Sequence, residues 1–352
     1  MRHTLSRRIL ALTLCATLHG CAVWRPLGFD GKASTPSLPA EIAAYYDYPR
    51  VPIQAVQIRE EKARSYVMRR YEFPLSLPDD LLPKNFEEFK KNTEALAATD
   101  QKTANDQKLQ YTNRVDLYLP LNLKPGQKRK GILISPILGG NMVVDHFARY
   151  YAGRGYVAAI VHRKRPFLPD DFQDMQGIED YMRTSLIRLR QAVDWFETVP
   201  EVDAGRIGSF GVSYGAVLHA MLSAIEPRVR YHILAMPAGP LADVIMGCPD
   251  PGIAKLVKKA REHGWADEKT YADLQRVLKT DPSQLAPWIP RDRVQVYVAL
   301  FDRVVGAKRS FGLWKEMGKP SLKVMPFGHY GGILVFPLLQ TQSYLTFQKH
   351  LR

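Results

Sequence analysis

The residues best suited to chemistry in this sequence are the five at 211–215, GVSYG, which place a serine in a Gly-x-Ser-x-Gly turn. An apolar run at 206–210 precedes the turn and predicts a strand, and the run at 214–225 predicts a helix. The two glycines allow a tight turn and close packing of helix on strand, so the hydroxyl of Ser213 is expected to stand out at the edge of a sheet. We therefore predict that Ser213 is a nucleophile. The alternative is a tight strand-to-helix turn without chemistry.

A serine hydroxyl is a weak nucleophile unless a base removes its proton. His329 is the best candidate for that base, because it lies between a predicted strand at 322–325 and a predicted helix at 333–350. A loop in this position can hold an imidazole over the sheet edge. Of the nine histidines, His162, at the end of another predicted strand, is the serious alternative.

The base must in turn be oriented by an acid. Asp302 directly follows the predicted strand at 294–300 and precedes His329 in the chain. The sequence therefore predicts a triad of Ser213, Asp302 and His329. Asp292 is a weaker candidate because it precedes the strand, and Asp302 could instead be a surface carboxylate that pairs with Arg303.

Acyl chemistry also needs hydrogen-bond donors for a developing oxyanion. The backbone N–H of Tyr214, the residue after the nucleophile, is the first expected donor. The second is expected from the loop SPILGGN at 135–141, whose paired glycines permit a ligand to approach the backbone. We favour the amide of Leu138, with Ile137 as the alternative donor. An ordinary loop at the start of a helix would show the same composition.

A basic cluster, HRKR at 162–165, follows the predicted strand at 157–161. Ligands of parallel α/β sheets bind at the carboxyl ends of the strands, so Arg163 and Arg165 could hold a carboxylate or phosphate of the substrate. The alternative is that the cluster pairs with Asp170, Asp171 or Asp174 and only orders its loop.

Short apolar strands alternate with helices through most of the chain. Strands are predicted at 66–73, 114–119, 130–135, 157–161, 206–210, 229–235, 294–300 and 322–325. Helices are predicted at 86–99, 141–154, 176–198, 214–225 and 333–350, with another between the last two strands. This alternation favours an α/β fold with a mostly parallel sheet covered by helices on both faces.

The connection at 237–293 is too long to be a bare loop in a compact domain. It contains two runs that predict helices, at 253–262 and 270–278. We predict that 237–293 is a helical lid over the site. The alternative is a peripheral addition that lies away from the site.

From about 130 to 350 the chain resembles the bacterial α/β-hydrolases akin to dienelactone hydrolase and acyl-peptidase-like esterases. The resemblance rests on the serine turn, on the order Ser, Asp, His, and on DRVVG at 302–306, where Gly306 replaces the usual proline. The loop at 135–141 is similar to the family's His-Gly-x-x-Gly loop, with Pro136 and Ile137 in place of His-Gly. The resemblance implies no metal or cofactor.

The resemblance implies the α/β-hydrolase fold and a serine hydrolase that cleaves a small-molecule carboxylic ester through an acyl-enzyme. Two alternatives stay open. One is an acyltransferase or peptidase on the same fold. The other is a non-catalytic envelope lipoprotein that uses the fold as a binding module, since one fold can carry many functions.

Residues 1–20 have the layout of a secretory signal peptide, with three arginines ahead of a short apolar run at 9–18. That run is shorter than the about 20 residues that span a bilayer. The sequence LHGC at 18–21 resembles the bacterial lipobox and predicts Cys21 as a lipidated N-terminus. A tether at 21–40 and the folded domain at 41–352 would follow. An ordinary cleaved signal peptide is the alternative.

With Ala22 after the cysteine, the resemblance implies a lipid anchor in the outer membrane, facing the periplasm. If the leader is processed, Cys248 remains as the one unmodified thiol, which excludes an internal disulfide framework. Lys and Arg exceed Asp and Glu by 49 to 35, for a net charge of +14. No nucleic-acid-binding motif accompanies this charge, so we expect no nucleic acid partner.

Overall fold

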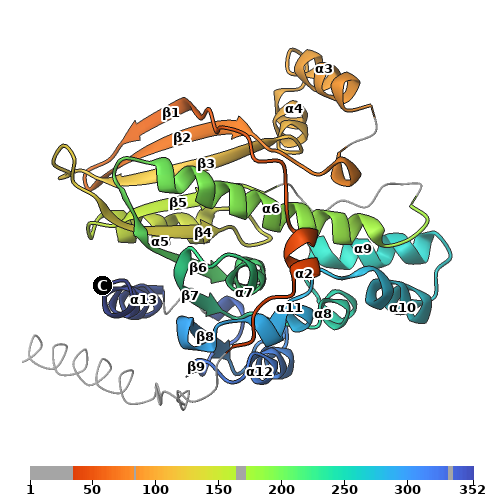
Figure 1. The fold of residues 1–352 in the computed structure, drawn as a ribbon. Coiled ribbons are helices and arrows are strands. Elements are labelled where there is room, and N and C mark those ends of the chain that lie inside the picture. The colour runs from red at the N-terminus through yellow and green to blue at the C-terminus, as the bar shows by residue number, and fades with distance from the viewer. Residues whose placement is uncertain (1–34, 83–84, 164–171, 332–335) are drawn as a thin grey trace, which may run out of the picture.

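The computed structural model describes residues 35–82, 85–163, 172–331 and 336–352 (Figure 1). The predicted signal peptide, Cys21 and Arg165 lie outside the described residues. Nine strands of the described chain form one sheet in the order β1-β2-β3-β5-β4-β6-β7-β8-β9. The strands are β1 (Val56–Lys62), β2 (Tyr66–Pro74), β3 (Thr112–Pro120), β4 (Arg129–Ser135), β5 (Val157–Val161), β6 (Val202–Val212), β7 (Val229–Ala235), β8 (Val294–Ala299) and β9 (Ser321–Met325).

The sheet is antiparallel from β1 to β5 and parallel from β5 to β9. The predicted mostly parallel sheet is therefore confirmed, with an antiparallel extension on one side. β1 is the outermost strand of that extension, and all seven of its residues are exposed. The central strands are buried on both faces, which explains why they consist of near-continuous apolar runs.

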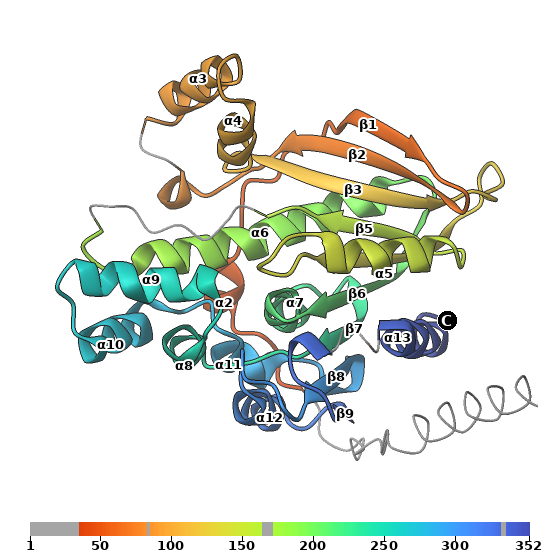
Figure 2. The same ribbon diagram turned by 180° about the vertical axis from the view of Figure 1, so that it is seen from behind.

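Helices cover both faces of the sheet (Figures 1 and 2). In β4, Leu133 packs into a cluster with α6 (Gln176–Thr198) and α7 (Tyr214–Ile225) on one face. Ile132 and Ile134 pack into a cluster with α5 (Met142–Ala152) and α13 (Phe336–His350) on the other. The described helices are α2 (Ala40–Tyr45), α3 (Phe86–Leu96), α4 (Gln101–Lys108), α5 (Met142–Ala152), α6 (Gln176–Thr198), α7 (Tyr214–Ile225), α8 (Leu241–Gly247), α9 (Pro251–Glu262), α10 (Asp267–Val277), α11 (Pro282–Leu285), α12 (Ala307–Glu316) and α13 (Phe336–His350). None of these described helices is long and apolar enough to cross a bilayer.

The segment at 237–293 forms α8, α9, α10 and α11, followed by two short 3-10 turns. The helices predicted at 253–262 and 270–278 are confirmed as α9 and α10, which begin two and three residues earlier than expected. Both views show α8, α9 and α10 grouped together near α6, on the side of the molecule away from α13 (Figures 1 and 2). This placement sets them beside the ends of the central strands that carry the site described below.

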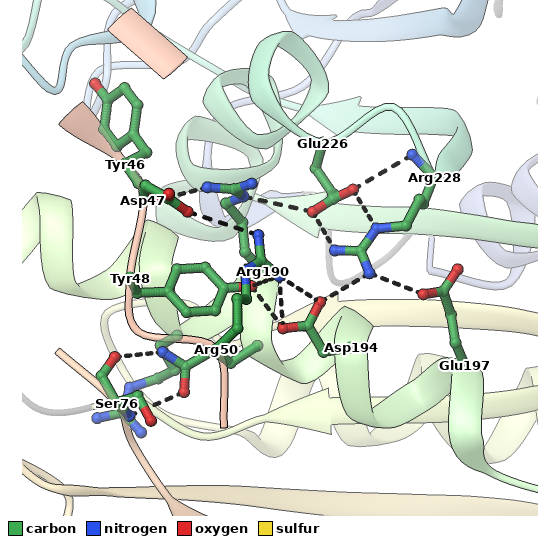
Figure 3. A network of polar contacts seen from close by, with 12 residues as sticks. Tyr46, Asp47, Tyr48, Arg50, Ser76, Arg190, Asp194, Glu197, Glu226 and Arg228 are labelled. Atoms are coloured by element: carbon green, nitrogen blue, oxygen red, sulfur yellow. Dashed lines mark hydrogen bonds and ion pairs between the residues drawn. The ribbon is translucent and has the colours of Figure 1, made fainter. Parts of the chain in front are cut away.

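A polar network fastens the segment after α2 to the outer surface of α6 (Figure 3). Asp194 of α6 accepts hydrogen bonds from the Tyr48 hydroxyl (2.6 Å) and from Arg50 (3.0 Å). The same carboxylate pairs with Arg228 (2.8 Å), which also binds Glu226 (2.7 Å) beyond α7. The network thus joins the N-terminal segment to two helices of one face.

Glu179 of α6 makes a second, fully buried junction. Its carboxylate accepts hydrogen bonds from the Tyr45 hydroxyl (2.7 Å), the Thr280 hydroxyl (2.6 Å) and the backbone N–H groups of Lys279 (3.0 Å) and Thr280 (2.8 Å). One side chain therefore connects α2, α6 and the chain that follows α10. It anchors the base of the 237–293 segment to the core.

Replacing Glu179 with alanine should lower the free energy of unfolding by about 3 kcal/mol or more, because several buried donors lose their acceptor. Chemical denaturation measures this change. Glu262→Ala is the matched control, since Glu262 is exposed and pairs with Lys258 on the surface across 3.4 Å. That control should change stability by less than about 0.5 kcal/mol. Equal losses in the two variants would show that the Glu179 junction does not stabilise the fold.

Candidate functional site

Ser213 lies at the turn between β6 and α7, in a left-handed backbone conformation with φ 54° and ψ −121°. The turn is held because the Ser213 N–H donates to the carbonyl of Ala235 at the end of β7 (2.8 Å). A Cβ at Gly211 would come within 2.3 Å of the Gly215 carbonyl oxygen, and a Cβ at Gly215 within 2.6 Å of that of Ser135. Both glycines of the motif are thus required by close backbone contacts, and the predicted strand-turn-helix context is present.

Asp302 and His329 are joined by a hydrogen bond of 2.8 Å between Oδ2 and Nδ1. The other carboxylate oxygen accepts the N–H groups of Val304 (2.9 Å) and Val305 (3.0 Å). Burial alone would raise the pKa of Asp302, but the hydrogen bond and charge of His329 and these two N–H groups lower it below its ordinary value. The carboxylate is therefore ionised at neutral pH and fixes one nitrogen of the imidazole.

Two loops bring these residues together after β8 and β9. The N–H of Leu300 donates to the carbonyl of Met325 (2.9 Å), and that of Phe301 donates to the carbonyl of Phe327 (3.0 Å). A Cβ at Gly328 would lie 3.1 Å from the Phe301 carbonyl oxygen, so a side chain there would crowd the neighbouring loop. The close approach of the loops explains why a residue next to His329 is a glycine.

Ser213 and His329 both line one cavity of about 340 Å³. Tyr214 and Leu138, the residues predicted to supply the oxyanion donors, line it as well. Most of the remaining lining is apolar and comes from α6, α7, α8, α9 and the loop before α5. Cys248, the free thiol, is buried in the same lining, and burial raises its pKa.

The loop at 135–141 connects β4 to α5 and turns sharply, with the Gly140 N–H donating to the Ile137 carbonyl (3.1 Å). Arg163 donates to that carbonyl (2.9 Å) and to the carbonyl of Leu138 (2.5 Å). Neither peptide bond is cis, and in a trans peptide the N–H points opposite to the C=O. The N–H groups of Leu138 and Gly139 therefore point away from the guanidinium.

Arg163 also lies against the aromatic wall of the cavity. Its guanidinium carbon is 5.2 Å from the centre of the Tyr214 ring, and Nη1 is 3.4 Å from the Tyr181 hydroxyl. The side chain predicted to grip a substrate anion thus contacts backbone carbonyls and aromatic rings of the protein itself. Arg165, its predicted partner in that role, is outside the described residues.

The alternative base, His162, belongs to a different cluster. Its Nε2 lies 2.8 Å from Asp116, and the same carboxylate pairs with Arg70 at 2.6 Å. Burial opposes ionisation of Asp116, yet the hydrogen bonds with Arg70 and His162 lower its pKa well below the ordinary value. Among the described residues, neither His162 nor the alternative acid Asp292 lines the cavity that contains Ser213.

Sequence reasoning did not identify the walls of the cavity. Ile178 and Met182 of α6 and Ile245 of α8 are buried there, yet in the sequence they look like ordinary core residues of amphipathic helices. The one available signal was the long helical connection at 237–293. Within the described part of the chain, no cluster of His, Cys, Asp and Glu has the arrangement of a metal site.

No protein-family model matches this chain, and no curated protein sequence matches it. Solved structures, in contrast, do match this chain. An acetyl xylan esterase from a Paenibacillus species superposes with a TM-score of 0.62 at 14% identity, over 88% of this chain and 93% of that one. Acetyl xylan esterase 1 from a Thermoanaerobacterium species gives 0.59 at 15% identity, over 88% and 95%. Together with the mostly parallel sheet and its flanking helices, these similarities show that the chain has the α/β-hydrolase fold.

Proposed function

We propose that this protein is a serine hydrolase that cleaves carboxylic esters through an acyl-enzyme. The observation that carries the proposal is that the strained Ser213 and His329, which is hydrogen-bonded to Asp302, line one cavity. Backbone strain of this kind costs about 1–3 kcal/mol and is commonly retained where a site needs it. The esterases with the same fold add support for an ester over other acyl compounds.

In the proposed reaction, Ser213 Oγ attacks the ester carbonyl while His329 Nε2 takes its proton. Asp302 holds Nδ1 and stabilises the imidazolium that forms. The imidazolium then gives the proton to the departing oxygen as the carbon–oxygen bond breaks, so that an alcohol leaves and the acyl group stays on the serine. Water, activated by the same imidazole, attacks the acyl-enzyme and releases the acid.

The N–H groups of Tyr214 and Leu138 are the proposed donors to the oxyanion. Tyr214 begins α7, and the first N–H groups of a helix have no partner within it. For Leu138, the support comes from Arg163, because the guanidinium binds the carbonyls on one side of the loop and turns the N–H groups to the other. We assign Arg163 as a positioning residue of this loop.

Acyl transfer and peptide cleavage could use the same residues, and product analysis with and without an added alcohol separates them from hydrolysis. A binding module without catalysis is the remaining alternative. It would leave the strain at Ser213 and the partly buried Asp302–His329 hydrogen bond without a role. Reactivity of Ser213 is therefore the most direct test.

Ser213→Ala should abolish labelling by a fluorophosphonate probe and reduce ester turnover by at least about 10⁴-fold. Ser209→Ala is the matched control, because Ser209 is a buried serine of β6, the strand that precedes Ser213; it binds His232 (2.8 Å) and does not line the cavity. The control should keep its labelling. Labelling of the Ser213→Ala protein at the wild-type level would place the nucleophile elsewhere.

His329→Ala and Asp302→Asn should each reduce kcat by roughly 10³-fold or more, since members of a triad act as a unit. His162→Ala and Asp292→Asn, the alternative base and acid, should stay within about tenfold of the wild type. Steady-state kinetics on a soluble ester measure all four variants. If His162→Ala lost activity while His329→Ala kept it, the base would have to be reassigned.

Arg163→Met should reduce kcat about 10–100-fold with little change in KM, because the loop that carries an oxyanion donor loses its support. Arg163→Lys should recover part of the loss. The measurement uses a neutral ester and an ester with a distal carboxylate. Equal losses on both support positioning, whereas a loss confined to KM for the anionic ester would return Arg163 to the predicted substrate-binding role.

A further inference from the structure

The cavity at Ser213 has one continuous apolar wall. It is built by Ile178 and Met182 of α6, Val217 of α7, Leu241 and Ile245 of α8, and Leu256 of α9. All of these residues are buried, with exposed fractions of 3% to 8%, so the wall is part of the core and not a surface groove. Four helices that meet in this way form a compartment suited to a group that water solvates poorly.

Few polar groups project into the described part of the lining. Apart from Ser213 and His329, its one carboxylate is Asp250, and its other hydroxyls are those of Tyr181, Tyr214 and Tyr330. A sugar ring carries several hydroxyl groups, each of which costs free energy when buried without a partner. The lining therefore does not match a carbohydrate, although the structural neighbours are named for xylan.

The cavity is much larger than an acetyl group. A water molecule occupies roughly 30 Å³ in the liquid, so about 340 Å³ holds on the order of ten atoms of that size. An acetyl group would leave most of the apolar wall without contact. A chain of about eight carbons would cover it.

The entrance is also apolar. Eight large apolar side chains are exposed among the described residues, and four of them lie in the loops that carry the site or directly beside them: Met142, Leu300, Phe301 and Tyr330. Met142 is 78% exposed and Tyr330 64% exposed, and both still line the cavity. Exposed apolar side chains gathered at a cavity mark a surface that meets apolar ligands.

We propose that the substrates are esters of apolar, medium-chain acids, and that the acyl chain lies against the wall formed by α6, α7, α8 and α9. The proposal rests on the hydrolase function proposed above and names its substrate class. Each methylene that leaves water for an apolar pocket strengthens binding by roughly fourfold. The preference should therefore rise with chain length until the cavity is full.

The first test is the chain-length profile of the wild-type protein on para-nitrophenyl acetate, butyrate, octanoate and laurate. We expect kcat/KM to reach its maximum at octanoate, at least about 100-fold above acetate, within the limit of about 4,000-fold that six methylenes at about fourfold each would set. Rates are taken below the concentration at which each ester forms micelles. A maximum at acetate, or a flat profile, would overturn the proposal even though the protein is an esterase.

Two neighbouring positions of α8 offer a matched pair of variants. Ile245→Trp fills the cavity and should reduce kcat/KM for octanoate about 30-fold or more while changing that for acetate less than threefold. Met246→Trp adds comparable bulk at a partly buried residue that does not line the cavity, and it should keep the wild-type profile. Thermal melts confirm that both variants are folded.

Binding measurements on the Ser213→Ala protein test the proposed substrate class independently of the proposed reaction. In calorimetry, this protein should bind the octanoate ester at least tenfold more tightly than the butyrate ester. Adding Ile245→Trp to Ser213→Ala should remove this difference in affinity. Equal binding of the two esters would overturn the apolar acyl site. Tight octanoate binding, without turnover or probe labelling of the wild type, would retain the apolar site and refute the hydrolase.

Discussion

The left-handed backbone of Ser213 is the constraint to which the rest of the structure conforms. A serine at φ 54° is strained, and it persists because the surrounding strands and helix leave it no alternative. Its N–H is bound to β7, its carbonyl accepts the N–H groups of Ala216 (2.8 Å) and Val217 (3.0 Å), and its flanking glycines touch neighbouring backbone. These partners are buried, and they belong to the ends of β4 and β7 and to the first turn of α7. The strain is thus supported by the part of the molecule that is hardest to distort.

The site combines two kinds of support. The proposed reacting groups come from the ends of β6, β8 and β9, whose positions are fixed by the ladder of parallel strands. The walls of the cavity come mainly from helices, and two of these, α8 and α9, belong to the 237–293 segment. The buried carboxylate of Glu179 anchors this segment to the core. The shape of the cavity can therefore vary with this segment while the strands keep the reacting groups in place. In this arrangement, the proposed reaction and the proposed substrate preference depend on different parts of the chain.

The sequence predicted those features that depend on short stretches of chain. The bounds of β5, β7, α6 and α7 agree with the predicted ranges, because their apolar patterns are uninterrupted. The pairing of Asp302 with His329 followed from their places after successive strands of a parallel sheet. The strand β1 and the helices α2 and α4 were missed, since few or none of their side chains are buried and they carry no apolar pattern. The contacts of Arg163 could not be predicted from the sequence either, because they depend on where the loop at 135–141 places the carbonyls of Ile137 and Leu138.

The open edge of the sheet at β1 has a consequence for how copies of this protein meet in solution. An unpaired edge strand offers free N–H and C=O groups to any other strand, and long apolar edges promote aggregation. Here the strand is interrupted by a register shift between Gln57 and Arg59, and its second half, REEK, is charged at every position. A second copy that paired along this edge would meet the shift and bring like charges together. Of the two sheet edges in the described chain, β1 is longer than β9, and these features protect it against the self-association that its length would otherwise invite.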